Sequence, residues 1–136
     1  MATVKEELLR SGNIMFPNKG VSMLPLIRQG RDLMIIEKRG SERLKKYDVV
    51  LFERPNGALV LHRISDVLED GYMIIGDNCI NKEYVKEGNV LGLMTGLLRD
   101  GKGLDLNSLR YKFYVKFWMA SYPVRRLIMK VKSRLR

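Results

Sequence analysis

Three polar residues of the chain could together form the catalytic set of a hydrolase. Ser22 lies in the segment GVSMLP, where Pro25 follows closely and interrupts any regular strand or helix. His62 is the only histidine and lies in the apolar segment LVLHRI, while Asp77 ends the segment IIGD. A serine hydroxyl becomes a useful nucleophile when an imidazole accepts its proton and a carboxylate holds that imidazole in the correct tautomer.

Each of these residues also has a purely structural interpretation. Serine and proline are common in turns, and an aspartate in Gly-Asp-Asn is typical of an Asx turn that ends a strand. A single histidine on a strand is often a hydrogen-bonded core residue, and geometry decides whether it is a base. The catalytic interpretation therefore requires a fold that brings the three side chains together.

Alternating and β-branched segments predict a mostly β domain around these residues. We expect strands at residues 14–16, 32–38, 47–54, 58–67, 71–77 and 89–99. Asn56-Gly57 and Asp70-Gly71 connect the middle three strands, and both dipeptides tolerate the positive φ of tight hairpin turns. The centre of the chain is thus predicted to be an antiparallel meander.

The same pattern predicts the surroundings of His62. Period-two alternation places Val60, His62 and Ile64 on one face of the strand, and Arg63 on the other face. Burial among apolar neighbours should lower the pKa of the imidazole and keep it neutral, as a general base requires. The hairpin that follows returns the strand ending at Asp77 beside the strand of His62.

Helices are predicted at both ends of the chain. Residues 3–6 fit a capping box and Gly12 is placed to end a short N-terminal helix. In the tail, apolar and aromatic residues recur every three or four positions, with an interruption at Pro123. We divide the chain into an N-terminal helix at 1–12, a β domain at 13–108 and a helical tail at 109–136.

The net charge of +10 is concentrated in the tail. Residues 110–136 contain nine basic and no acidic residues, whereas the remainder contains 16 basic and 15 acidic residues. Basic amphipathic helices with aromatic residues are typical of the surface of anionic membranes. We expect residues 110–136 to contact such a surface; the alternative is that their apolar side packs on the domain's own sheet.

The composition argues against several other classes of site and protein. A single cysteine, Cys79, excludes an intramolecular disulfide, and with one histidine we expect no metal site and no cofactor. Cys79 is either a neighbour of the chemistry or a small buried hydrophobe. No apolar run reaches the about 20 residues that span a bilayer, and the opening residues do not resemble a signal peptide. We expect a peripheral membrane protein on the cytoplasmic side of a bacterial-type cell.

Four segments, in this order, resemble the signal peptidase family, in the Ser-His branch of the S24/S26 serine peptidases. They are GVSMLPLIRQGRD, YDVVLFER, LHRI and IIGDN, and the resemblance covers roughly residues 20–98. It implies a mostly β fold of coiled antiparallel sheets and a serine endopeptidase that cleaves leader or signal peptides. It also implies Ser22 as nucleophile and oxyanion donor, His62 as general base, and Asp77 as the residue that assists the base.

Other residues of these segments are expected to support the site. Met23, Pro25 and Arg63 match the family's segments and should shape the site without taking part in chemistry. Asn78 completes the Gly-Asp-Asn segment and belongs to the same supporting group.

The chain also departs from the family's pattern. Gly20 stands where relatives can have an additional hydroxyl for the oxyanion, and Arg31 is inserted into the usual Gly-Asp. Glu83 stands six residues after Asp77, where this branch often has a second aspartate that a glutamate could replace. The N-terminal anchor of membrane-bound signal peptidases is not seen, so the basic tail is expected to hold the enzyme beside the membrane.

The sequence therefore supports two classes of function. The first is an endopeptidase that accepts an extended segment of a precursor protein by strand addition. The second is a LexA-like regulator of the same fold, self-cleaving or non-catalytic, with its tail on nucleic acid. A nearly neutral body without a preceding helix-turn-helix makes nucleic acid an unexpected partner. A third interpretation, an inactive binding module, applies if His62 and Asp77 lie away from Ser22.

Overall fold

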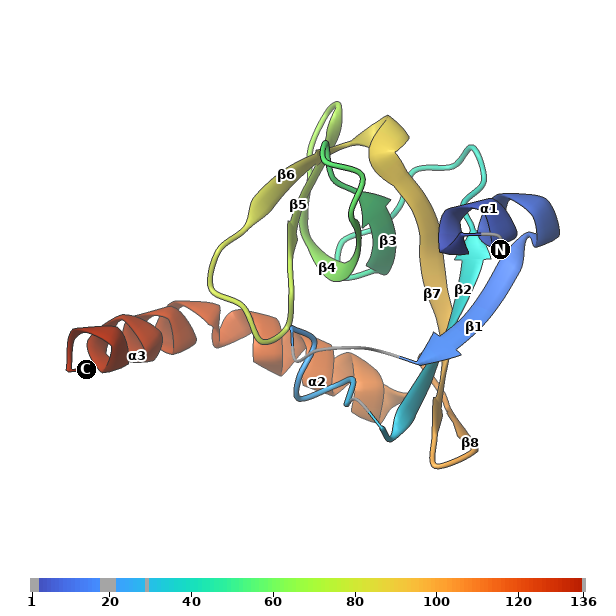
Figure 1. The fold of residues 1–136 in the computed structure, drawn as a ribbon. Helices are drawn as coiled ribbons and strands as arrows, with labels where there is room; N and C mark the ends of the chain where they lie inside the picture. Colours follow the sequence, from blue (N-terminus) through green and yellow to red (C-terminus); the bar gives the residue numbers. More distant parts are fainter. Residues whose placement is uncertain (1–2, 18–21, 29, 136) are drawn as a thin grey trace.

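The computed structural model describes residues 3–17, 22–28 and 30–135, and within them eight strands form one antiparallel sheet accompanied by three α-helices (Figure 1). The elements in chain order are α1 (Val4–Ser11), β1 (Asn13–Pro17), β2 (Asp32–Lys38), β3 (Val49–Glu53), β4 (Leu59–Val67), β5 (Gly71–Ile75), β6 (Glu83–Lys86), η1 (Glu87–Asn89), β7 (Val90–Arg99), β8 (Lys102–Leu104), α2 (Leu109–Ala120) and α3 (Tyr122–Arg134). The predicted mostly β class is confirmed.

The sheet has the strand order β1-β2-β7-β3-β4-β5-β6, with β8 paired to β7. Strands β3 to β6 pair with their neighbours in sequence, which confirms the predicted antiparallel meander. Strand β7 returns to lie between β2 and β3. This order places β4, which carries His62, inside the sheet between β3 and β5.

Both faces of this curved sheet are covered by apolar residues. Val49 and Leu51 of β3 join one buried cluster, whereas Val50 and Phe52 join the other, because successive side chains of a strand point to opposite faces. The first cluster also contains Leu8 of α1 together with three residues of the bend that follows Ser22: Met23, Leu26 and Ile27. Burial of that bend holds the backbone of the candidate nucleophile against the sheet.

The N-terminal helix forms as its sequence predicts. The Thr3 hydroxyl accepts a hydrogen bond from the Glu6 amide at 3.1 Å, and Gly12 adopts φ 86° at the C-terminal end. Two short strands, β6 and β8, were not predicted. Strand β5 ends at Ile75, earlier than expected, so Asp77 lies in the loop after the strand.

The C-terminal helices run one after the other past one end of the sheet (Figure 1). Ser108 caps α2 by accepting a hydrogen bond from the Tyr111 amide at 3.1 Å. One side of α2 packs on the body, where Val115 is buried and Tyr114 is partly buried. On this side the structure supports packing against the protein itself, the alternative interpretation of the tail. No helix in the described ranges is both long and apolar enough to span a membrane.

Candidate active site

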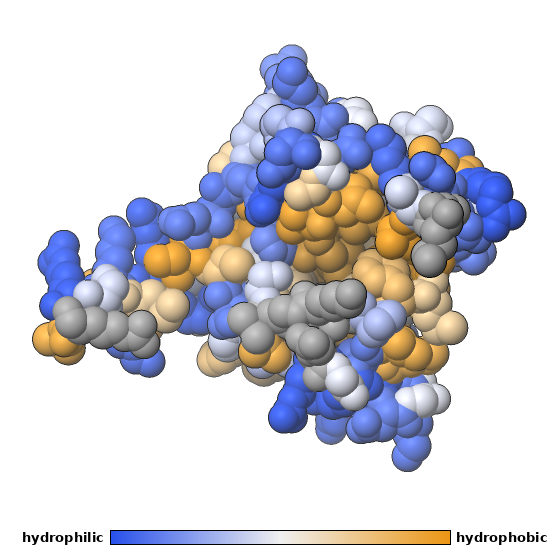
Figure 2. Space-filling view, in the orientation of Figure 1, coloured by the Kyte–Doolittle hydropathy of each residue, from blue (hydrophilic) through white to orange (hydrophobic). Residues whose placement is uncertain are grey.

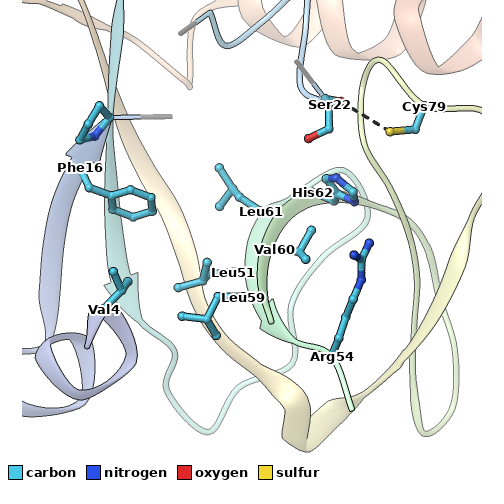
Figure 3. A pocket seen from close by; sticks show the side chains of 11 residues that line it. Val4, Phe16, Ser22, Leu51, Arg54, Leu59, Val60, Leu61, His62 and Cys79 are labelled. Carbon is cyan, nitrogen blue, oxygen red and sulfur yellow. Dashed lines mark hydrogen bonds between the residues drawn. The ribbon is translucent and has the colours of Figure 1, made fainter. Parts of the chain in front are cut away.

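A cleft of about 840 Å³ lies beside the residues that were predicted to do chemistry. Most of its wall is apolar and comes from α1, β1, β3 and β4, and Figure 2 shows the apolar hollow on this face of the molecule. The polar residues Ser22, His62 and Cys79 gather at one end, away from Val4 and Phe16 (Figure 3). A polar group is thus placed at the end of an apolar cleft, an arrangement common in ligand sites.

Ser22 and His62 meet around Gly76. A Cβ atom on Gly76 would lie 2.6 Å from the Ser22 carbonyl oxygen and 3.0 Å from His62 Nε2, so both groups border the same point. The Ser22 hydroxyl points into the cleft (Figure 3). Among the described residues, however, it is not hydrogen-bonded to the imidazole. The Ser22 backbone and His62 Nε2 thus border the same point, and both residues line the same end of the cleft.

The imidazole of His62 is buried and has a free ring nitrogen. The residue is 7 % exposed, and its ring packs edge-on against Phe52 with 6.1 Å between ring centroids. Burial lowers the pKa of His62, as expected from its strand, and the charge of Arg54 acts in the same direction. Its Nδ1 has no hydrogen-bond partner in the described structure. His62 is therefore a neutral imidazole at neutral pH, and its Nε2 side borders Ser22.

Glu83 lies on the other side of the imidazole. Its Oε1 is 4.0 Å from His62 Nδ1, and its negative charge raises the pKa of His62 against the effect of burial. Arg54 holds this carboxylate through Nη2 at 2.8 Å and Nε at 3.2 Å. A closer approach of about 1 Å would give Nδ1 a hydrogen bond. The carboxylate expected to replace a second aspartate is thus the one that faces the base.

Asp77 occupies a different place from the one predicted. Its two carboxylate oxygens accept hydrogen bonds from Arg63 at 2.8 and 3.0 Å, and one also accepts from the Tyr114 hydroxyl at 2.8 Å. The expectation that Asp77 holds the imidazole is therefore corrected. The physical reason is alternation along β4: Arg63 points away from the face of His62, and Asp77 pairs with the guanidinium on that opposite face.

The Arg63–Asp77 pair is almost completely buried, with side chains 1 % and 0 % exposed. Burial disfavours the charged guanidinium, but the hydrogen bonds and charge of Asp77 outweigh it and raise the pKa of Arg63. The pKa of Tyr114 is also raised, first by burial and then by the neighbouring carboxylate. The pair holds the loop that contains Asp77 against β4 and α2, next to the candidate site.

The loop 76–79 connects the site to the C-terminal helices. The Asn78 amide donates to the Ser22 carbonyl at 2.8 Å, and the Trp118 indole donates to the Asp77 carbonyl at 2.7 Å. Arg125 donates to the same carbonyl at 3.1 Å and stacks on Trp118 at 4.3 Å. Sequence reasoning missed this role of the helices; Tyr114 and Trp118, spaced by four residues, were the available signal.

The remaining predicted residues surround this centre or lie outside it. Met23 is fully buried, and its sulfur accepts a hydrogen bond from the Asp77 amide at 3.3 Å, while Pro25 is exposed. Cys79 donates to the Ser22 carbonyl at 3.8 Å, and burial raises the pKa of its thiol, so it is a protonated neighbour of the site. Gly20 lies outside the described residues.

The assembled groups can perform one kind of chemistry without further components. A serine hydroxyl at the end of an apolar cleft can pass its proton to a neutral imidazole backed by a carboxylate. In the described part of the chain, His, Cys, Asp and Glu side chains form no group of three that could hold a metal ion. Comparison of the sequence with models of protein families and with curated proteins found no match.

Proposed function

We propose that the protein is a serine endopeptidase of signal-peptidase type, with Ser22 as nucleophile and His62 as general base. The observation that carries the proposal is that Ser22 and the buried imidazole of His62, whose pKa is lowered, line the same end of an apolar cleft on either side of Gly76. The mostly β antiparallel body and the four ordered segments that resemble the signal peptidase family support it.

The proposed reaction proceeds through an acyl-enzyme. His62 Nε2 removes the proton of the Ser22 hydroxyl as its oxygen attacks the scissile carbonyl, and the imidazolium then protonates the leaving amine. The Ser22 amide stabilises the oxyanion, and the bond from Asn78 to the Ser22 carbonyl fixes the bend. Water releases the acyl group. Glu83 stabilises the imidazolium, and the contact between Ser22 and His62 tightens when substrate fills the cleft, as such bonds often do.

The shape of the cleft favours an extended apolar peptide as substrate. Its wall combines Phe16 of β1 with Leu51, Leu59 and Leu61 of the β3–β4 hairpin. Strand β1 ends the strand order, so one of its edges can pair with an added strand of substrate. Alternate side chains of that strand would enter the cleft beside Ser22. An extended leader or signal peptide would fit this description.

A mixture of blocked peptides with apolar residues at varied positions, analysed by mass spectrometry, tests the proposal. Wild type and Cys79→Ser should cleave the same peptides at the same bonds. Ser22→Ala and His62→Ala should lose at least about 10³-fold in kcat/KM. Absence of cleavage by wild type, or undiminished cleavage by Ser22→Ala, would overturn the assignment. Conversion of the chain itself to fragments, without cleavage of the peptides, would instead support the LexA-like regulator.

A further inference from the structure

Helices α2 and α3 form one nearly continuous helical surface. The hydrogen bonds from the Ser121 amide to the Phe117 carbonyl and from the Arg125 amide to the Ser121 carbonyl, both 3.0 Å, carry the helical pattern through the junction. Ser121 itself has right-handed helical backbone angles, φ −79° and ψ −3°. Successive side chains along residues 109–135 are therefore rotated by about 100° around one helix axis, and this rotation shows which side of the helices each residue occupies.

This count separates two sides of the helical surface. The side that faces the body carries Tyr114, Trp118, Tyr122 and Arg125, which all bond to the loop after β5. The other side carries eight large apolar residues within one sector of about 100°. We call these eight residues the apolar stripe: Leu109, Phe113, Phe117, Val124, Leu127, Ile128, Val131 and Leu135.

The apolar stripe is exposed along its whole length. Its residues are between 47 % and 85 % exposed, and the rings of Phe113 and Phe117 stack on each other with centroids 6.3 Å apart. At the rise of an α-helix the stripe spans about 40 Å. Contiguous exposed apolar surface of this extent is typical of a contact with a partner or a membrane.

The charges beside the apolar stripe are all positive. By the same count, five basic residues line one edge of the stripe and two more flank the other. The first group, the basic row, is Lys112, Lys116, Arg126, Lys130 and Arg134; the second is Arg110 and Lys132. The last acidic residue of the sequence is Asp105. In the described part of the chain, none of these seven basic residues forms an ion pair. The outer side of the helices therefore combines apolar side chains with positive charges that no acidic side chain of the described structure neutralises.

We propose that the outer side of α2 and α3 lies flat on an anionic lipid bilayer. The apolar stripe enters the boundary between headgroups and acyl chains, and the basic row contacts the phosphates. A second copy of the chain would bring two positive surfaces together, which like-charge repulsion opposes. Nucleic acid would neutralise the basic row but would leave the eight apolar residues in water. An anionic bilayer satisfies both parts of the surface.

The proposal also locates the candidate active site. Trp118 and Arg125 hold the Asp77 carbonyl from the inner side of the same helices. The loop 76–79, and through it Ser22, is thus fixed relative to the outer side that carries the apolar stripe. The cleft is held close to the membrane surface by packing within the body. Membrane binding requires no catalysis, so it can be tested separately from the peptidase proposal.

Flotation of the full chain with lipid vesicles measures membrane binding and tests whether the apolar stripe is responsible for it. Wild type and Ser22→Ala should bind equally to vesicles of equimolar phosphatidylcholine and phosphatidylglycerol, and weakly to phosphatidylcholine alone. Phe113→Gln with Phe117→Gln should weaken binding at least about tenfold, since two phenylalanines leave the apolar phase. The matched control is Leu9→Gln with Val67→Gln, which are exposed apolar residues on the body. It should bind as wild type, and circular dichroism should show that both double variants are folded.

Lipids brominated on their acyl chains test the orientation, because the protein contains a single tryptophan on the inner side. They should quench the fluorescence of a Trp118→Phe, Phe117→Trp variant and leave that of wild-type Trp118 nearly unchanged. The proposal is overturned if wild type fails to bind anionic vesicles, if the Phe113/Phe117 variant binds as well as the control, or if Trp118 is the residue that is quenched. Preferential binding to duplex DNA at equal salt, or a dimer that the same variant abolishes, would assign the surface to those partners instead.

Discussion

The pKa of His62 is set by burial and by nearby charges, and the charges of Arg54 and Glu83 can be removed one at a time. Burial lowers its pKa, the positive charge of Arg54 lowers it further, and the negative charge of Glu83 raises it. If His62 is the general base, it must be neutral, so activity should be lost as the pH falls through this lowered pKa. The residues around His62 therefore make a specific prediction about the pH profile.

We expect kcat/KM to rise with pH and to reach half its plateau below pH 6.5, the ordinary pKa of histidine. Glu83→Gln should move this midpoint lower, because a charge that favours the imidazolium is removed. Arg54→Gln should move it higher, because an opposing charge is removed and Glu83 is released. Initial rates of peptide cleavage between pH 4.5 and 8 give the three midpoints. Identical midpoints in the three proteins would show that these side chains do not face the base.

Asp77 and Arg63 illustrate a different role for buried charges. If Asp77 supports the fold through Arg63, Asp77→Asn should lower the free energy of unfolding by about 3–5 kcal/mol, since it leaves a guanidinium buried and unpaired. Asp66→Asn, which breaks a half-exposed pair with Lys82, should cost about 1 kcal/mol or less. Urea unfolding followed by circular dichroism measures both. A folded, fully stable Asp77→Asn protein with a large loss of kcat would restore Asp77 to the catalytic set.

At the scale of elements, the strands with clear periodicity could be predicted and those without it could not. Strand β2 matches its predicted range, and the Asn56-Gly57 turn joins β3 to β4 as expected. The segment EYVK of β6 has charged residues at both ends and only two apolar residues, so its sequence contains little strand signal. It forms because β5 offers an edge to pair with, which is a tertiary cause.

The candidate site was only partly predictable from the sequence, because some of its contacts depend on tertiary packing. Local sequence placed Ser22 at a bend and His62 on a strand, and both positions are confirmed. The partner of Asp77 depends on which face of β4 it meets, and alternation already places Arg63 and His62 on opposite faces. The spacing of Tyr114 and Trp118 places them on one side of α2, but Phe113 and Phe117 have the same spacing on another side. Sequence alone therefore could not show which of the two pairs packs on the body.

The loop between β5 and β6 provides a test at the scale of elements. A methyl group on Gly76 would lie 2.6 Å from the Ser22 carbonyl oxygen, so Gly76→Ala must displace the bend or the imidazole. Misplacement of this kind should reduce kcat by about 10²-fold. Gly88→Ala, where a methyl group meets nothing within 4 Å, is the matched control and should keep wild-type kcat. Equal kcat values for the two variants would contradict the geometry of the site.

At the scale of the whole molecule, the β body forms most of the cleft, and helices α2 and α3 pack on the body with one side and expose the other side to solvent. The first core cluster fixes the bend after Ser22, and the inner side of α2 and α3 fixes the loop that contacts the Ser22 carbonyl. The outer side of the same helices presents the apolar stripe and the basic row. We therefore propose that catalysis and membrane contact take place on separate surfaces, which are joined through the loop 76–79.

The central claim is that His62 activates Ser22 as a nucleophile, and trapping the acyl-enzyme tests it most directly. The chain would be mixed with a blocked apolar peptide nitrophenyl ester, quenched in acid, digested and analysed by mass spectrometry. We expect one acyl group on the fragment that contains Ser22 in wild type, none there in Ser22→Ala, and a large reduction in His62→Ala. An unlabelled Ser22, labelling that does not depend on His62, or an acyl group on Cys79 in its place would contradict the account.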